Sequence, residues 1–520
     1  MNHATADDKE FLGKQPIGKL LLKLAIPTVI AQLINMLYNI VDRIYIGHIP
    51  GEGDMALTGL GVCLPLILLV SAFAALVANG GAPRASIFMG RGENDAAEKT
   101  LGNCFVTLLG ISAVLTAALL IWNVPLLWLF GASENTIGYA TDYMNIYAIG
   151  TIFVQMTLGM NAFITAQGFA KTGMLSVLIG AVLNIGLDPL FIYAFGMGVK
   201  GAALATILSQ AASCAWVLLF LFGKRTFLKI RVKHFLLKAR IILPSLALGF
   251  STFIMQASES IILICFNSSL YRYGGDIAVG AMTILSSVMQ FAMLPLQGLG
   301  QGAQPIISYN YGARNAERVR AAFRMLLKAS LCYSAFLWIL VMAAPQIFAM
   351  MFTPEPALIA YTSRALRIYL AVLVLFGIQL ACQMTFTSLG NAPASIAAAV
   401  VRKFVLLLPL IYIVPLIYTS DQATAVFLAE PIADAVAVTF TAVLFFFQFR
   451  KAMRLIEEPT AKPDSVRAEN LPELTDAEGC AEIGSAENSE VRTGESSEAL
   501  TRESSEVRTE EMIDGEEESK

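Results

Sequence analysis

Residues 26–47 read IPTVIAQLINMLYNIVDRIYIG, an apolar helix that carries an aspartate deep in its second half. The segment is long enough to cross the ~30 Å hydrocarbon core of a bilayer, which takes about 20 helical residues. A carboxylate at such depth costs at least ~2.5 kcal/mol, so it persists only where it faces a cavity or a partner. Asp42 is therefore the first candidate functional residue.

The composition extends this interpretation to most of the chain. Of 520 residues, 56% are hydrophobic and 14% are charged, with a mean hydropathy of +0.65, whereas soluble proteins carry about 25% charged residues. The sequence therefore predicts an all-α polytopic membrane protein with twelve transmembrane helices. The predicted spans are residues 20–47, 55–82, 101–121, 139–167, 173–194, 199–222, 241–270, 278–308, 325–344, 361–390, 395–418 and 424–449.

The distribution of basic residues predicts the orientation in the membrane. The connections at 84–99, 223–240 and 312–328 carry three, seven and five Lys or Arg residues, and those at 122–138 and 419–423 carry none. Basic connections stay in the cytoplasm. We see no cleavable signal before the first span, so we expect both termini to be cytoplasmic.

The chain contains an internal duplication. Pro83 and Gly90 recur as Pro305 and Gly312, with 222 residues separating the members of each pair. Such repeats are typical of transporters whose halves move about a central cavity. We predict an N-lobe at 1–222, a basic cytoplasmic linker at 223–240, a C-lobe at 241–450, and an acidic tail at 451–520 whose composition favours disorder.

Four polar residues of the N-lobe form the main candidate site. Asn184 and Asp188 lie four residues apart and so share one face of the fifth span. A depth estimate of 1.5 Å per residue places Asp42 and Thr206 at a similar level in the outer half of the membrane. Oxygen ligands of this kind suit a hard cation or a shared proton. The alternative is that each acid merely pairs with Arg43 or with the backbone.

The C-lobe carries further acids and bases at membrane depth. Glu430 and Asp434 lie on one face of the last span, where they could pair with Arg402 as a structural bridge or contact substrate. Lys403 is expected to extend toward the membrane surface.

Methionines and amides of spans seven and eight are candidates for an adaptable drug-binding wall. Met282 and Met289, with Gln256, have flexible side chains that suit many ligand shapes. Packing in the core or against lipid explains each methionine equally well.

Several motifs together resemble the multidrug and toxic compound extrusion (MATE) family, closest to its bacterial MepA-type branch. The resemblance covers residues 10–450. It is carried by GxGVxxPL at 59–66, GRGE at 90–93, Asn184-x3-Asp188-Pro189, GxxGAAxAT at 198–206 and EPIAD at 430–434.

The resemblance implies a V-shaped antiporter of the bacterial cell membrane, which exports amphipathic and often cationic drugs in exchange for sodium ions or protons. It would need no cofactor besides the coupling ion. The expected partners are small-molecule drugs, lipophilic cations and membrane lipids, and we expect a monomer that binds no nucleic acid.

The same resemblance assigns roles to individual residues. The cation site corresponds to Asp42, Asn184, Asp188 and Thr206, so Na⁺ is a possible occupant. Tyr38 and Asn161 match cavity positions, and Glu259 matches an acid that some members use for cation or substrate. Members with a C-lobe cation site carry an aspartate on helix ten, and residues 369–390 contain none. We therefore favour the N-lobe.

Other functional classes fit the sequence less well. An enzyme would need a nucleophile with a base, a metal set or a phosphate loop, and no HExxH, GxSxG or Walker pattern occurs. A flippase for lipid-linked diphosphates, from the same superfamily, is the main alternative; its cavity should be lined by several Arg or Lys residues to hold diphosphate. A passive channel would not need paired carboxylates in one lobe.

Overall fold

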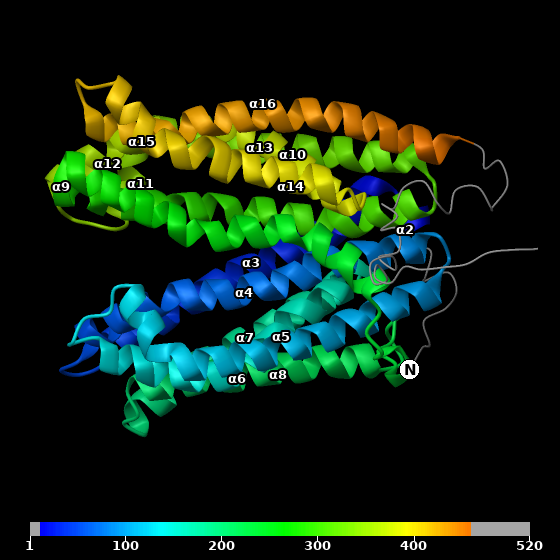
Figure 1. Cartoon of the computed structure of the whole chain (residues 1–520), viewed down its shortest axis with the longest axis horizontal. Coiled ribbons are helices and arrows are strands. Elements are labelled where there is room, and N and C mark those ends of the chain that lie inside the picture. The colour runs from blue at the N-terminus through cyan, green and yellow to red at the C-terminus, as the bar shows by residue number, and fades with distance from the viewer. Residues whose placement is uncertain (1–10, 459–520) are drawn as a thin grey trace, which may run out of the picture. The chain divides into compact units, whose positions relative to one another are not determined.

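The computed structural model describes residues 11–458, and every regular element in that range is a helix (Figure 1). The amino-terminal half contains α2 (Phe11–Lys14), α3 (Ile17–Gly47), α4 (Gly53–Gly90), α5 (Asn94–Leu129), α6 (Ile137–Ala166), α7 (Ala170–Pro189), the π-helical η1 (Leu190–Ala194) and α8 (Val199–Phe222). The remainder contains the 3-10 turn η2 (Val232–His234), α9 (Ala239–Gly312), α10 (Ala316–Ala343), α11 (Pro345–Met350), α12 (Pro356–Tyr369), the 3-10 turn η3 (Leu373–Leu375), α13 (Phe376–Ser388), α14 (Ala392–Val400), the π-helical η4 (Val401–Leu407), α15 (Leu408–Ile417) and α16 (Gln422–Glu457).

The described residues contain the twelve predicted spans. Ten helices are long and apolar enough to cross a membrane, and one of them, the 74-residue α9, consists of two helices joined at a break, each matching one predicted span. Gly275 interrupts α9 with a φ of 63°, a conformation that glycine adopts without steric cost. A further span is the pair formed by α12 and α13, whose axes differ by 48°. The predicted all-α class is confirmed.

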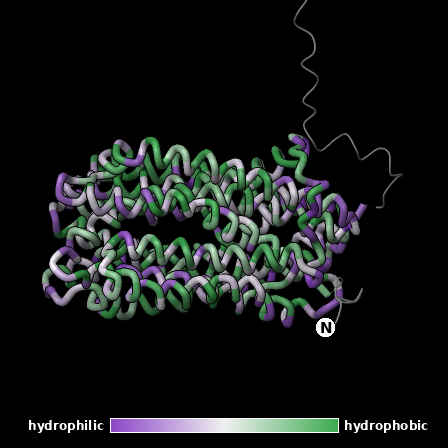
Figure 2. The backbone as a smooth tube through the Cα atoms, turned by 90° about the horizontal axis from the view of Figure 1, so that it is seen from below, coloured by the Kyte–Doolittle hydropathy of each residue, from purple (hydrophilic) through white to green (hydrophobic). Residues whose placement is uncertain are grey.

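The spans form two lobes, α3 to α8 and α9 to α16 (Figure 1). Each lobe has its own buried apolar cluster, one around Met144 and Tyr147 and the other around Phe266 and Phe427. Figure 2 shows hydrophilic residues gathered toward the two ends of the helices. The helix α16 continues to Glu457, past the predicted boundary at 450; the rest of the predicted tail, from 459 onward, lies outside the described residues.

The two lobes meet backbone to backbone at the end of the helices that carries the basic connections. Gly90 of α4 lies so close to the carbonyl oxygen of Tyr309 that a Cβ would overlap it, and Gly312 of α9 lies equally close to the carbonyl oxygen of Ile87. The duplication relates the two contacts, since 222 residues separate each glycine and each carbonyl from its counterpart. The hydroxyl of Thr28 adds a cross-lobe hydrogen bond of 2.6 Å to a carbonyl oxygen of α9.

The basic linker between the lobes is tied to the N-lobe. The fully buried Gln167, which follows α6, accepts hydrogen bonds of 2.8 Å from the hydroxyl of Thr226 and from the amides of Phe227 and Leu228. Glu98 of α5 binds Arg231 at 2.7 Å. The linker is therefore held by contacts with N-lobe side chains that could not be predicted from the linker sequence.

We expect Gln167→Ala to lower the melting temperature by several degrees and to speed tryptic cleavage within the linker. The change leaves the backbone amides of Phe227 and Leu228 without their side-chain acceptor, at about 1–3 kcal/mol for each buried unsatisfied donor, whereas the hydroxyl of Thr226 keeps the carbonyl oxygen of Leu228 as a partner. Thermal unfolding and limited proteolysis of the purified protein measure both effects. Gln155→Ala is the matched control, because Gln155 is equally buried but binds Val70. If both variants left the linker equally resistant, Gln167 would not hold it.

Candidate ion site in the amino lobe

The structure brings together the four residues predicted to bind a cation or proton. The amide nitrogen of Asn184 on α7 donates to Asp188 Oδ1 at 3.2 Å and lies 3.5 Å from the hydroxyl of Thr206 on α8. Asp42 of α3 is within electrostatic reach of Asp188. Three helices thus supply two carboxylates, an amide and a hydroxyl to one place, near the end of the lobe opposite the linker.

The oxygens of this cluster are buried, and several of them accept no hydrogen bond. Asp188 is 0% exposed, Asn184 2% and Asp42 8%. Among the described residues, none donates a hydrogen bond to Asp42 Oδ1, Asn184 Oδ1 or Asp188 Oδ2. Buried polar atoms are nearly always satisfied, so three orphan oxygens in one cluster mark a place for a proton or a cation. Hard cations prefer such oxygen ligands.

The local backbone helps to form the cluster. Pro189 follows Asp188 and cannot donate a backbone hydrogen bond, and the five residues after it form the π-helical η1. Such π-helical stretches are frequent at functional sites. The fifth span of the C-lobe also contains one, η4, so the two halves share this irregularity.

Tyrosines on α3 and α6 lie near the carboxylates: Tyr38 is half-buried, and Tyr143 and Tyr147 are buried. Tyr38 and Tyr143 are both within electrostatic reach of Asp42, and Tyr143 is next to the hydroxyl of Thr206. The rings of Tyr143 and Tyr147 are stacked at 6.1 Å. The sequence analysis included Tyr38 but missed Tyr143, although a tyrosine at each of two positions four residues apart is a signal for one polar face.

The C-lobe acids differ from those of the N-lobe because they are paired. Arg402 binds Asp434 at 2.8 Å and Glu430 at 3.3 Å, as the bridge reading predicted. The expectation that Lys403 extends to the membrane surface is wrong: Lys403 is 5% exposed, and its amine binds Glu259 at 2.8 Å. The buried amine is neutralised by a carboxylate of its own lobe, so it does not need to reach water at the membrane surface.

The predicted drug-contacting residues are dispersed. Tyr38 joins the ion cluster, whereas Asn161 lies near the linker end of α6 and donates to the carbonyl oxygen of Gly173 at 3.3 Å. In the C-lobe, Gln256 and Glu259 are exposed. Met282 is 2% exposed within the core, and Met289 packs against that core from its edge.

Comparison with known proteins identifies the family. A family model described as MatE matches residues 27–190 and residues 251–413. The two matches together span more than half of the chain, and each falls within one lobe. The chain belongs to the MatE family, a family of membrane transporters, as the motifs predicted.

Individual relatives agree with this assignment. Multidrug export protein MepA of Staphylococcus haemolyticus is 24% identical over 374 residues, which cover 71% of this chain and 80% of that protein. A solved structure of MATE in the bent conformation has a TM-score of 0.80 and 24% identity, covering 86% of this chain and 98% of that one. The outward-facing conformation of a multidrug resistance MATE family transporter has a TM-score of 0.79 and 24% identity, covering 87% and 99%. These structures establish the common two-lobe fold.

Proposed function

We propose that this protein is a secondary active exporter that exchanges amphipathic or cationic drugs for protons or sodium ions by alternating access. The relatives named multidrug export proteins support this substrate class. The protein would act in the bacterial cell membrane without any cofactor other than the coupling ion.

The observation that carries the proposal is the contrast between the acids of the two lobes. Asp42 and Asp188 are buried and have no ion-pair partner among the described residues, whereas Glu430 and Asp434 share Arg402. A buried carboxylate that is not engaged in an ion pair binds a proton or cation readily. The N-lobe pair is therefore the site at which we place ion coupling.

Alternating access requires a closed gate on one side. The cross-lobe contacts of Gly90 and Gly312 lie at the basic end of the helices, which we infer to be cytoplasmic, with both termini on that side. The ion cluster lies toward the other end. The contacts at the basic end support a conformation closed to the cytoplasm, from which ions reach Asp42 and Asp188.

The alternative, a flippase for lipid-linked diphosphates, would require cations free to hold the diphosphate. Both Arg402 and Lys403 instead bind carboxylates of their own lobe. This pairing favours the drug exporter.

We expect efflux of ethidium from energised vesicles to stop when the coupling gradient collapses. Sodium and pH gradients are imposed separately, and ethidium fluorescence reports transport, so the assay also identifies the ion. Vesicles without the protein are the control for passive leak. Efflux that persists after both gradients are removed would refute ion-coupled transport.

A further inference from the structure

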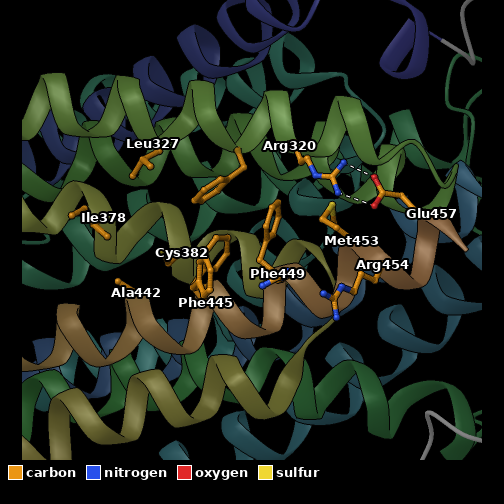
Figure 3. A pocket seen from close by; sticks show the side chains of 13 residues that line it. Arg320, Leu327, Ile378, Cys382, Ala442, Phe445, Phe449, Met453, Arg454 and Glu457 are labelled. Carbon is orange, nitrogen blue, oxygen red and sulfur yellow. Dashed lines mark hydrogen bonds and ion pairs between the residues drawn. The ribbon is translucent and has the colours of Figure 1, made fainter.

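A groove of about 640 Å³ lies in the C-lobe between α10, α13 and α16. Figure 3 shows that its lining is amphipathic, with Leu327, Ile378 and Ala442 toward one end and Arg320, Arg454 and Glu457 toward the other. The volume falls within the ~300–1,000 Å³ range of small-molecule sites. The groove is separate from the ion cluster, which belongs to the other lobe.

Stacked aromatic rings form the middle of the groove. The ring of Phe445 lies 4.5 Å from that of Phe323 and 4.9 Å from that of Phe449, centroid to centroid. These side chains come from α10 and α16 and present a continuous apolar surface. Such a surface favours a hydrocarbon chain over an ion.

Positive charge dominates the other end. Arg320 is held by both oxygens of Glu457. Arg450 and Arg454 are exposed and make no ion pair with another described residue. Three arginines and one glutamate leave this end cationic. It therefore repels cationic drugs and complements an anion.

The sequence of α16 places the groove at the membrane boundary. Residues 435–449 contain no charged side chain, and Arg450, Lys451 and Arg454 follow directly. From Ala442 to Arg454 the groove extends about 18 Å along the helix axis, close to half of the ~30 Å hydrocarbon core. The groove as a whole is therefore about as long as one leaflet, with its apolar part in the hydrocarbon and its arginines at headgroup level.

We propose that this groove binds one anionic phospholipid. Arg450 and Arg454 hold the phosphate, and an acyl chain lies along Phe445 and Phe449. Basic pockets between transmembrane helices on the cytoplasmic side recognise anionic headgroups in this way, and arginine suits phosphate through its fork of donors.

Native mass spectrometry of the purified, delipidated full chain tests the proposal by titration with phosphatidylglycerol and, separately, phosphatidylcholine. The protein should retain one phosphatidylglycerol at least tenfold more tightly than phosphatidylcholine. Arg450→Ala combined with Arg454→Ala should weaken phosphatidylglycerol about thirty-fold, the loss expected for two arginines facing an anionic headgroup. Equal retention of the two lipids by the unmodified protein would overturn the proposal.

Two matched controls separate this site from general charge and surface effects. Arg324→Ala with Lys451→Ala also removes two positive charges, from α10 and α16 at positions outside the groove lining, and should leave phosphatidylglycerol binding unchanged. Ala442→Phe should block the acyl chain with the arginines intact, whereas Val443→Phe, outside the lining, should not. Identical losses within either pair would contradict the site. Displacement of the lipid by inorganic phosphate alone would show that the arginines bind a soluble anion.

Discussion

Asp42→Asn or Asp188→Asn is expected to reduce gradient-driven efflux to the level of vesicles without the protein. Asparagine keeps the shape of the side chain, and an uncharged residue inserts into the membrane more easily, so the variants should reach the membrane. The ion, however, loses the carboxylate that it must occupy. A ligand shifts a conformational equilibrium only by its differential affinity for the two states, so ion binding can no longer drive the exchange.

The measurement is ethidium efflux at equal amounts of membrane-inserted protein, together with equilibrium drug binding, which we expect the variants to retain. Asp142→Asn is the matched control, because Asp142 is an N-lobe carboxylate that pairs with Lys200 at 3.4 Å and lies outside the cluster. Glu259→Gln should impair turnover less than the cluster variants. If Asp42→Asn and Asp188→Asn transported at the wild-type rate and Glu259→Gln did not transport, the ion site would have to be assigned to the C-lobe instead.

Arg402→Met is expected to abolish accumulation of folded protein. The Arg402 side chain is 7% exposed and its partners Glu430 and Asp434 are 5% and 3% exposed, so its removal strands two acids in the interior. Breaking such a pair costs about 3–5 kcal/mol, a large part of the 5–15 kcal/mol that stabilises most proteins. Size-exclusion profiles of the solubilised protein and its melting temperature measure the loss.

Two further variants test this explanation. Adding Glu430→Gln and Asp434→Asn to Arg402→Met should restore folding, because the interior then contains no uncompensated charge. Lys403→Met should cost less, since its partner Glu259 has a side chain that is 62% exposed and can be hydrated. A triple variant as unstable as the single one would show that Arg402 stabilises the lobe through packing, for example on the ring of Phe376.

The sequence predicted the spans and the N-lobe cluster well, for physical reasons. A bilayer forces each span to satisfy its own backbone hydrogen bonds, so long apolar segments report helices directly. Because the helix that precedes Pro189 is regular, the spacing of Asn184 and Asp188 was enough to predict that their side chains share one face. Depth along α3 and α8 then placed Asp42 and Thr206 at the same level.

Irregular backbone and contacts between helices limited the remaining predictions. In an α-helix, Lys403 would point about 100° away from Arg402, but both lie in the π-helical η4, and both side chains are buried and bind acids of their own lobe. The rotation of α6 that turns Asn161 toward Gly173 depends on neighbours that its own sequence does not specify. The linker is anchored largely through its backbone amides, and because every residue type except proline has one, the sequence does not show which of them are bound.

The reciprocal contacts of Gly90 and Gly312 also have a mechanical meaning. At these two glycines the joint is made by main chains in direct contact, with no side chain between them. Because this contact lies at one end of long helices, it can serve as the pivot about which the two lobes rotate. Replacing either glycine with alanine would push the two main chains apart. Because the helices extend far beyond this contact, a small displacement here would become a larger one at their opposite ends.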